Sequence, residues 1–174
     1  FPGDSIQFIN DNEIFVSGEF GTLMKSNDAG ATWKTLASIK EEFYPQDLYF
    51  EDSQNGWVIG LVGAIFHTKD GGRSWYKQES NTLVSLFRMQ KAGGYLFAVG
   101  GEGKIIALVN NEWQEIDHGK NIRLYIGSIE SLNNNRIIVT GPVGTLHILS
   151  IDDMIRNVDE NAVVSVEKTN TEGS

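Results

Sequence analysis

The sequence of 174 residues contains no cysteine and only three prolines. No apolar run in it approaches the roughly 18 residues of a membrane-spanning helix. The lack of cysteine excludes disulfides and thiolate chemistry but does not identify a compartment. Basic residues are also scarce: 14 lysines and arginines stand against 23 aspartates and glutamates, for a net charge of −9. This balance disfavours a broad nucleic-acid surface and adsorption to anionic lipid, because both need a basic patch.

The chain also lacks an initiating methionine and an apolar signal segment, since it begins with the residues FPGD. We therefore expect a mature or excised piece whose targeting segment is missing.

What the chain does have is repetition. An octapeptide occurs twice, 42 residues apart: residues 26–33 read SNDAGATW and residues 68–75 read TKDGGRSW. A G-x-x-G frame occurs four times, starting at Gly18, Gly60, Gly100 and Gly141, with a short apolar run on either side of each copy. A period of about 40–45 residues with several short strands per unit is typical of β-propeller blades, which must pack on neighbours to bury both sides.

The repeat predicts an all-β protein, a β-propeller of about four blades with four antiparallel strands each. The predicted repeat region is 1–158, with blades near 6–42, 48–82, 86–121 and 126–151. The fourth strand of the last blade is obscure, and residues 162–167, AVVSVE, either supply it or pair with another blade. Residues 159–174 are thus expected to hold a closing strand and a flexible tail. Only residues 152–157, DDMIRN, fit a short helical turn.

The octapeptide has a local physical explanation. Asp28 and Asp70 can accept hydrogen bonds from the backbone of their own turn, and a glycine two positions later can supply the positive φ that the turn needs. The tryptophan that ends each copy can pack its indole into the blade. No ligand is needed, so the following residues are predicted to be structural: Ser26, Asp28, Gly30, Thr32, Trp33, Thr68, Asp70, Gly72, Ser74 and Trp75.

The octapeptide resembles the Asp-box, or BNR repeat. Residues 55–78, NGWVIGLVGAIFHTKDGGRSWYKQ, are similar to the repeat of the Ycf48-like photosystem II stability/assembly factors. The resemblance implies a seven-bladed, non-enzymatic scaffold that binds a protein partner, such as a membrane-complex subunit, without a cofactor and in an extracytoplasmic location. It also implies that the octapeptides lie opposite the functional face. This chain departs from the family in having about four blades and five scattered arginines in place of a cluster.

Because successive strands of a blade run in opposite directions, the G-x-x-G turns and the blade-to-blade connections share the face opposite the octapeptides. Exposed apolar and aromatic residues beside acidic ones suit protein recognition. The alternative is that these side chains pack against each other over the mouth of the channel. The candidate binding residues are Glu19, Phe20, Tyr44, Leu61, Val62, Glu102, Arg123, Tyr125 and Val143.

No catalytic group emerges from the sequence. A sialidase needs clustered arginines, and other glycosidases need two facing carboxylates. Asp47 is the best single carboxylate, followed by Asp4, and capping a turn is the favoured role of both. The three histidines are dispersed, and His67 and His147 are expected on opposite sides of their blades, so no metal site is predicted.

The competing hypothesis is a fragment of an Asp-box glycoside hydrolase, or a carbohydrate-binding propeller. A ring of only four blades also raises the question of closure. We expect either a truncated larger protein or an assembly that completes the ring, because exposed strand edges tend to associate.

Overall fold

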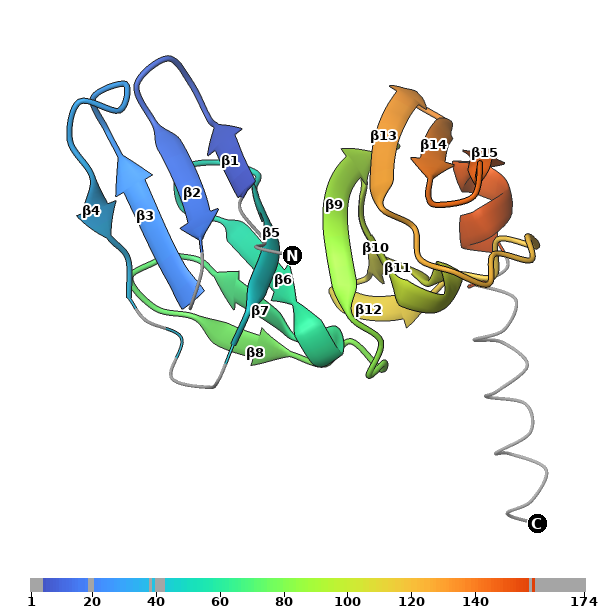
Figure 1. Ribbon diagram of the computed structural model, residues 1–174. Coiled ribbons are helices and arrows are strands. Elements are labelled where there is room, and N and C mark those ends of the chain that lie inside the picture. Colours follow the sequence, from blue (N-terminus) through green and yellow to red (C-terminus); the bar gives the residue numbers. More distant parts are fainter. Residues whose placement is uncertain (1–4, 19–20, 38, 40–42, 157, 159–174) are drawn as a thin grey trace, which may run out of the picture.

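The computed structural model describes residues 5–18, 21–37, 39, 43–156 and 158. This part of the chain forms four sheets in which every strand pairing is antiparallel. Three sheets have four strands and the last has three, and each sheet follows the order of the sequence (Figure 1). The predicted all-β propeller architecture of about four blades is therefore confirmed.

Each sheet is one blade. The first blade contains β1 (Ser5–Phe8), β2 (Ile14–Gly18), β3 (Thr22–Ser26) and β4 (Lys34–Thr35). The second contains β5 (Pro45–Phe50), β6 (Gly56–Gly60), β7 (Ile65–Thr68) and β8 (Tyr76–Gln78). The third contains β9 (Leu86–Ala92), β10 (Tyr95–Gly100), β11 (Ile105–Val109) and β12 (Glu112–Glu115). The last contains β13 (Ser128–Asn133), β14 (Arg136–Thr140) and β15 (Leu146–Ser150).

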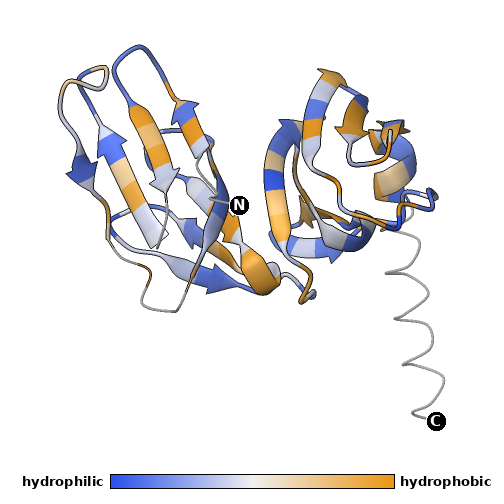
Figure 2. Ribbon diagram, in the orientation of Figure 1, coloured by the Kyte–Doolittle hydropathy of each residue, from blue (hydrophilic) through white to orange (hydrophobic). Residues whose placement is uncertain are grey.

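The first strands of the blades, β1, β5, β9 and β13, neighbour one another in that order and form the inner side of the arc. We call the side of a blade that faces the preceding blade its backward side, and the side that faces the next blade its forward side. Alternation along each strand places apolar residues on both sides, because both must be buried. Figure 2 shows these residues as hydrophobic stretches along the strands, whereas the turn from β1 to β2 is hydrophilic.

The core consists of three clusters, one at each junction between blades. Phe15 on the forward side of the first blade packs with Leu48 and Phe50 of the second, where the rings of Phe15 and Phe50 stack at 3.6 Å. Trp57 and Ile59 of the second blade pack with Met89 of the third. A polar bridge fixes this junction: Gln78 Oε1 accepts hydrogen bonds from both Trp57 Nε1, at 3.1 Å, and Trp113 Nε1, at 3.0 Å.

The last blade ends differently from the others. Residues 151–156 form a helix where the other blades pass into their fourth strand. This helix begins one residue before the stretch 152–157 that the sequence predicted as a helical turn. Ile151, Met154 and Ile155 are buried in the cluster between the third and last blades. The Asp152 N–H also donates to Asn135 Oδ1 at 2.9 Å. Residues 162–167, which the sequence offered as a closing strand, lie outside the described residues.

Candidate functional site

The two octapeptide loops are built in the same way. Asp70 Oδ1 accepts hydrogen bonds from Ser74 N and Thr68 Oγ1, both at 2.9 Å, and Asp70 Oδ2 accepts one from Ser74 Oγ at 2.6 Å. Asp28 Oδ1 likewise accepts from Thr32 N and Ser26 Oγ, both at 2.8 Å. Because each carboxylate is satisfied within its own loop, the loop needs no ligand to hold its shape.

These bonds keep both carboxyl groups ionised. The Ser74 hydroxyl and N–H lower the pKa of Asp70 to about 2, and the Thr32 side chain and N–H lower the pKa of Asp28 below its ordinary value. Hydrogen bonds to the charged form of a carboxyl group have this effect. A carboxylate that is fully occupied and difficult to protonate is poorly suited to acid–base catalysis.

The two tryptophans of the octapeptides behave differently. Trp75 packs edge-on against Phe50 at 6.1 Å and joins the core between the first two blades. Trp33 remains 37% exposed, so its indole packs less completely into the blade than that of Trp75. The reason is its position: Trp33 precedes β4, which has only two residues and covers little of the first blade.

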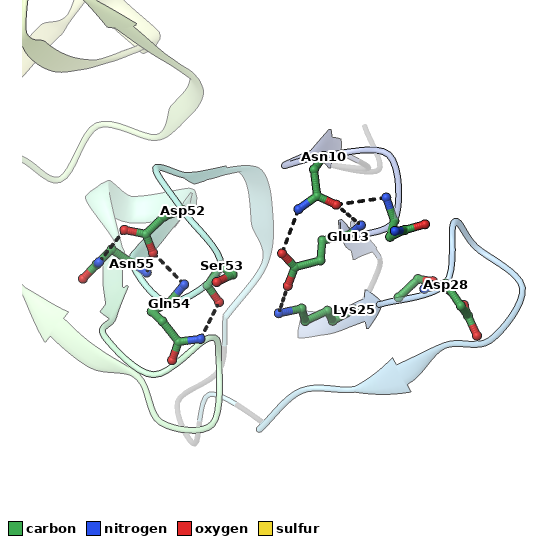
Figure 3. Close-up of polar contacts among 10 residues, drawn as sticks. Asn10, Glu13, Lys25, Asp28, Asp52, Ser53, Gln54 and Asn55 are labelled. Atoms are coloured by element: carbon green, nitrogen blue, oxygen red, sulfur yellow. Dashed lines mark hydrogen bonds and ion pairs between the residues drawn. The ribbon is translucent and has the colours of Figure 1, made fainter.

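The remaining turns on this octapeptide face are polar and satisfied as well (Figure 3). Asn10 Oδ1 accepts the N–H groups of Asn12 and Glu13, both at 2.9 Å, and Lys25 pairs with Glu13 at 2.8 Å. The bond from Lys25 lowers the pKa of Glu13. Asp52 accepts hydrogen bonds from Gln54 N, Asn55 N and Asn55 Nδ2. The turns themselves use these polar groups, which leaves few for a partner.

The opposite face, which we call the glycine face, is organised by the G-x-x-G turns. The first glycine lies directly over the chain that enters its own blade. A Cβ atom at Gly60, Gly100 or Gly141 would lie 2.3, 2.0 or 2.4 Å from the carbonyl oxygen of Tyr44, Ser85 or Tyr125, respectively. No side chain fits at such distances, so the first glycine allows the turn and the connection to pack backbone against backbone.

The last glycine of the frame contacts the connection that leaves for the next blade. A Cβ at Gly63 would lie 2.0 Å from Thr82 O, and one at Gly103 would lie 2.4 Å from Ile122 O. The residue before this glycine is left-handed, with φ of 56° at Val62, 55° at Glu102 and 57° at Val143. Such a conformation is unfavourable for a β-branched residue. The packed glycines of the second and third blades thus hold Val62 and Glu102 in left-handed, outward-facing positions, and Val143 has the same conformation in the last blade.

Exposed apolar side chains gather on this face. Val143 is 92% exposed, Leu83 is 82% exposed and Val62 is 64% exposed. Half of the large hydrophobic residues that are exposed in the described chain lie in the turns and connections of the glycine face: Tyr44, Leu61, Val62, Leu83, Leu124, Tyr125 and Val143. Fewer residues of this kind lie by the octapeptide face: Trp33, Tyr76 at the start of β8 and Leu132 at the end of β13. The two faces therefore differ in polarity.

The structure places most of the predicted binding residues together on the glycine face. Glu102 and Arg123 are exposed there beside the apolar residues. Glu19 and Phe20 lie outside the described residues. Tyr125 meets the ring of Phe87, which is not a candidate residue, edge-on at 5.8 Å. Leu83 and Leu124 lie in the blade-to-blade connections that the sequence predicted on this face, although neither was among the candidate binding residues.

A cavity of about 420 Å³ lies beside the turn of the third blade. It is lined by groups of both charges, including Glu102, Lys104, Glu115, His118 and Lys120. Lys120 N donates to His118 Nδ1 at 3.2 Å, so His118 Nε2 carries the proton and meets Gly103 O at 3.0 Å. Mixed charges around an open hollow suit a polar segment of a partner better than a single ion.

Asp47, the best catalytic candidate from the sequence, is buried between blades. Asp47 Oδ1 accepts from Ser5 Oγ at 2.5 Å and Leu48 N at 2.9 Å, and Asp47 Oδ2 accepts from Met89 N at 2.7 Å. Burial raises the pKa of Asp47, and these hydrogen bonds oppose the rise. The carboxyl group joins three inner strands, so the predicted turn-capping role is wrong. Asp4 lies outside the described residues.

The structure also shows where two of the three histidines lie. His67 stacks on Trp57 at 4.3 Å and shares the forward side of its blade, whereas His147 pairs with Val139 on the backward side. The two histidines therefore lie on opposite sides of their blades, as expected. Among the residues that the structure describes, no three His, Asp or Glu side chains converge as metal ligands would. Within the same residues, no helix has the length and apolar content of a membrane crossing.

Four consecutive antiparallel blades around one axis define this protein as a β-propeller. Solved propellers share its fold, including "YCF48 bound to D1 peptide", with a TM-score of 0.60 and 18% identity over 83% of this chain and 53% of that one. An ancestral GH74 enzyme aligns with a TM-score of 0.67 and 14% identity over 85% of this chain and 22% of the enzyme. At such identities these two likenesses show the fold alone.

Sequence comparison narrows the class. The chain is 23% identical to the photosystem II stability/assembly factor HCF136 of Arabidopsis thaliana over an alignment of 160 residues. This alignment covers 87% of the chain. It is 29% identical over 73 residues, 40% of the chain, to the photosystem II assembly lipoprotein Ycf48 of a Synechococcus species. Sequence and structure together make this protein a distant homologue of the Ycf48/HCF136 assembly factors.

Two facts limit what this homology implies for the chain. The chain spans 38% of the length of HCF136 and 22% of the Synechococcus protein. No protein-family model matches the chain, so the Asp-box assignment of the octapeptides stays a prediction.

Proposed function

We propose that this protein is a non-enzymatic propeller scaffold of the assembly/stability-factor type, which binds a segment of a protein partner on its glycine face. The observation that carries the proposal is the division of the surface. Exposed apolar side chains gather on the glycine face, whereas the polar groups of the octapeptide face are used by its own loops. Recognition surfaces combine apolar anchors with a polar rim, and Glu102 and Arg123 supply the rim here.

The partner is expected to be an extended segment of a membrane-complex subunit. The turns present Leu61, Val62, Glu102 and Val143 as separate anchors along the arc, which suits a peptide that contacts several blades in turn. The solved YCF48 structure with a D1 peptide supports a peptide ligand. The name of the Synechococcus relative, a lipoprotein, supports an extracytoplasmic location.

Carbohydrate hydrolysis is less well supported. The carboxyl group with the best claim to catalysis, that of Asp47, is buried and bonded to Ser5, Leu48 and Met89. The named relatives by sequence include assembly factors. The GH74 neighbour aligns at 14% identity and shares the fold.

The test uses peptide selection with matched variants. A displayed peptide library and a D1 peptide are applied to the wild type and to Val62→Asp, Val143→Asp and Asn111→Asp proteins. All three positions are left-handed, with φ of 56°, 57° and 67°, and aspartate tolerates this conformation. Asn111 belongs to the β11–β12 turn on the octapeptide face, so Asn111→Asp controls for backbone strain and added acidity.

We expect the two valine variants to lose at least about tenfold in affinity for the selected peptides, the effect of burying a charge at an anchor position. The Asn111→Asp protein should bind like the wild type. The proposal fails if binding is lost only in the Asn111→Asp protein. It also fails if neither the library nor the D1 peptide yields a ligand sensitive to the valine variants.

A further inference from the structure

Among the residues that the structure describes, no blade covers the outer side of either end blade of the arc. The inner strands β1, β5, β9 and β13 neighbour one another in order, and in the described part of the chain no comparable contact joins β13 to β1. The backward side of the first blade, which we call the first open side, carries Ile6 and Phe8 on β1. The forward side of the last blade, the last open side, carries Ile138, Leu146 and Ile148.

The first open side has the composition of a blade junction. Equivalent positions in the blades are found by counting back from the first glycine of each G-x-x-G frame. Two positions before that glycine stand Val16, Val58 and Val139, and their partners on the inner strand are Ile6, Leu48 and Ile129, respectively. The equivalent side chains Leu48 and Ile129 are 5% and 3% exposed, because the preceding blade covers them, whereas Ile6 is 59% exposed. Phe8 is 63% exposed, whereas its equivalent, Phe50, is 2% exposed.

The last open side repeats this pattern. Leu146 is equivalent to Leu23, Ile65 and Ile105 in the other blades. Each of the four lies on the third strand of its blade and pairs with the residue immediately before the first glycine of the G-x-x-G frame. These three equivalents are at most 3% exposed, whereas Leu146 is 58% exposed. Ile148 is 50% exposed at the position where Ala107 is fully buried. Ile6 and Leu146 therefore occupy positions that every internal junction buries under another blade, and Phe8 and Ile148 occupy positions that one internal junction buries.

We propose that two copies of this chain join head to tail, with the last open side of each copy packed on the first open side of the other. A two-fold axis along the centre would then close a ring of eight blades, four from each copy. The occupant is a second copy because the chain itself carries the complementary side: internal junctions pair a forward side with a backward side of this same composition. Closure also removes both exposed ends of the arc at once.

Polar groups at the junction fit the same arrangement. Between the first two blades, the side-chain amide of Gln7 accepts from Phe50 N and donates to Phe50 O. Glu130 holds the position of Gln7 in the last blade, since it pairs with Ile138 as Gln7 pairs with Phe15. Across the new junction, Glu130 would meet the backbone of Phe8 in the second copy and could accept its N–H.

This inference goes beyond the proposed function and does not depend on it. The glycine face lies at the ends of the strands, so a closed ring leaves it open for a partner. A failure of ring closure would therefore leave peptide binding intact, and the reverse also holds.

The test is the mass of the full chain in solution, measured by light scattering and by sedimentation over a range of concentrations. We expect a species of twice the 19.3 kDa of one chain. Phe8→Lys and Leu146→Glu, on opposite open sides, should each weaken the dimer by about a hundredfold, because each buries a charge without a partner. Leu83→Glu, at a residue 82% exposed on the glycine face, is the control and should not change the mass.

The decisive experiment mixes the two charged variants. When Phe8→Lys and Leu146→Glu proteins are combined, one junction of the ring is wild type and the other pairs lysine with glutamate, so the dimer should return. Glu130→Gln should tighten the dimer by about fivefold or more, since it restores the two hydrogen bonds that Gln7 makes. A wild type that stays at 19.3 kDa at all concentrations overturns the proposal, as do open-ended polymers or a mixture that fails to recover.

Discussion

At the residue scale, the octapeptide is a local device whose structure follows from its own sequence. Asp70 meets groups only two to four positions away, so the hydrogen bonds to Thr68, Arg73 and Ser74 could be predicted from spacing. The role of Asp47 could not be predicted in this way. Its partners Ser5 and Met89 each lie 42 positions distant, and only the packing of three blades brings them together.

Replacement of Asp70 by asparagine should lower the melting temperature at neutral pH. The folded pKa of Asp70 is about 2, below its ordinary value of 3.8, so its contribution to stability is present above about pH 4 and is lost as the pH falls toward 2. The difference in melting temperature between wild type and Asp70→Asn should therefore shrink over that range. Thermal unfolding at several pH values measures it, with Asp11→Asn as a control at another exposed aspartate. A difference that stays constant with pH would contradict this role.

Replacement of Asp47 by alanine should destabilise the protein by about 2–4 kcal/mol, because the N–H groups of Leu48 and Met89 would be left buried without acceptors. Ser128 holds the equivalent position on β13 and is exposed, so Ser128→Ala should change stability by about 0.5 kcal/mol or less. Urea unfolding of both variants measures the contrast. Equal effects would mean that the carboxyl group does not join the inner strands.

At the element scale, the G-x-x-G turns of the second and third blades are each packed between two connections. The sequence predicted that these turns share a face, but it could not show why both glycines are needed. The reason is close backbone packing: the first glycine meets the entering connection and the last meets the leaving one. The strained residue between them follows from that packing and becomes an exposed anchor.

Gly100→Ala should therefore destabilise the third blade strongly, by about 3 kcal/mol, because the new Cβ would lie 2.0 Å from the Ser85 carbonyl oxygen. The adjacent Gly101→Ala is the matched control. Its Cβ would meet a Val84 methyl group at 2.9 Å, and a side chain can move aside, so we expect a loss of about 1 kcal/mol. Denaturant unfolding of the pair measures the difference. A smaller loss at Gly100 than at Gly101 would contradict this close backbone packing.

At the scale of the whole molecule, the blade count and the two faces could be predicted because they depend on a period and on alternation. The exposure of individual residues could not, because it depends on what covers them. Leu48 and Ile6 occupy equivalent positions, yet only Leu48 has a neighbouring blade in front of it. The sequence placed the connections that contain Leu83 and Leu124 on the glycine face, but their exposures of 82% and 50% come from the packing of the blades.

The central claim is that the glycine face binds the partner, and the lack of cysteine allows a direct test. Single cysteines introduced as Val143→Cys and Asn111→Cys carry the same photo-reactive label on opposite faces of the propeller. After irradiation with a selected peptide, mass spectrometry should show the peptide attached to the protein labelled at position 143 and not to the one labelled at position 111. Attachment at position 111 alone would contradict the account.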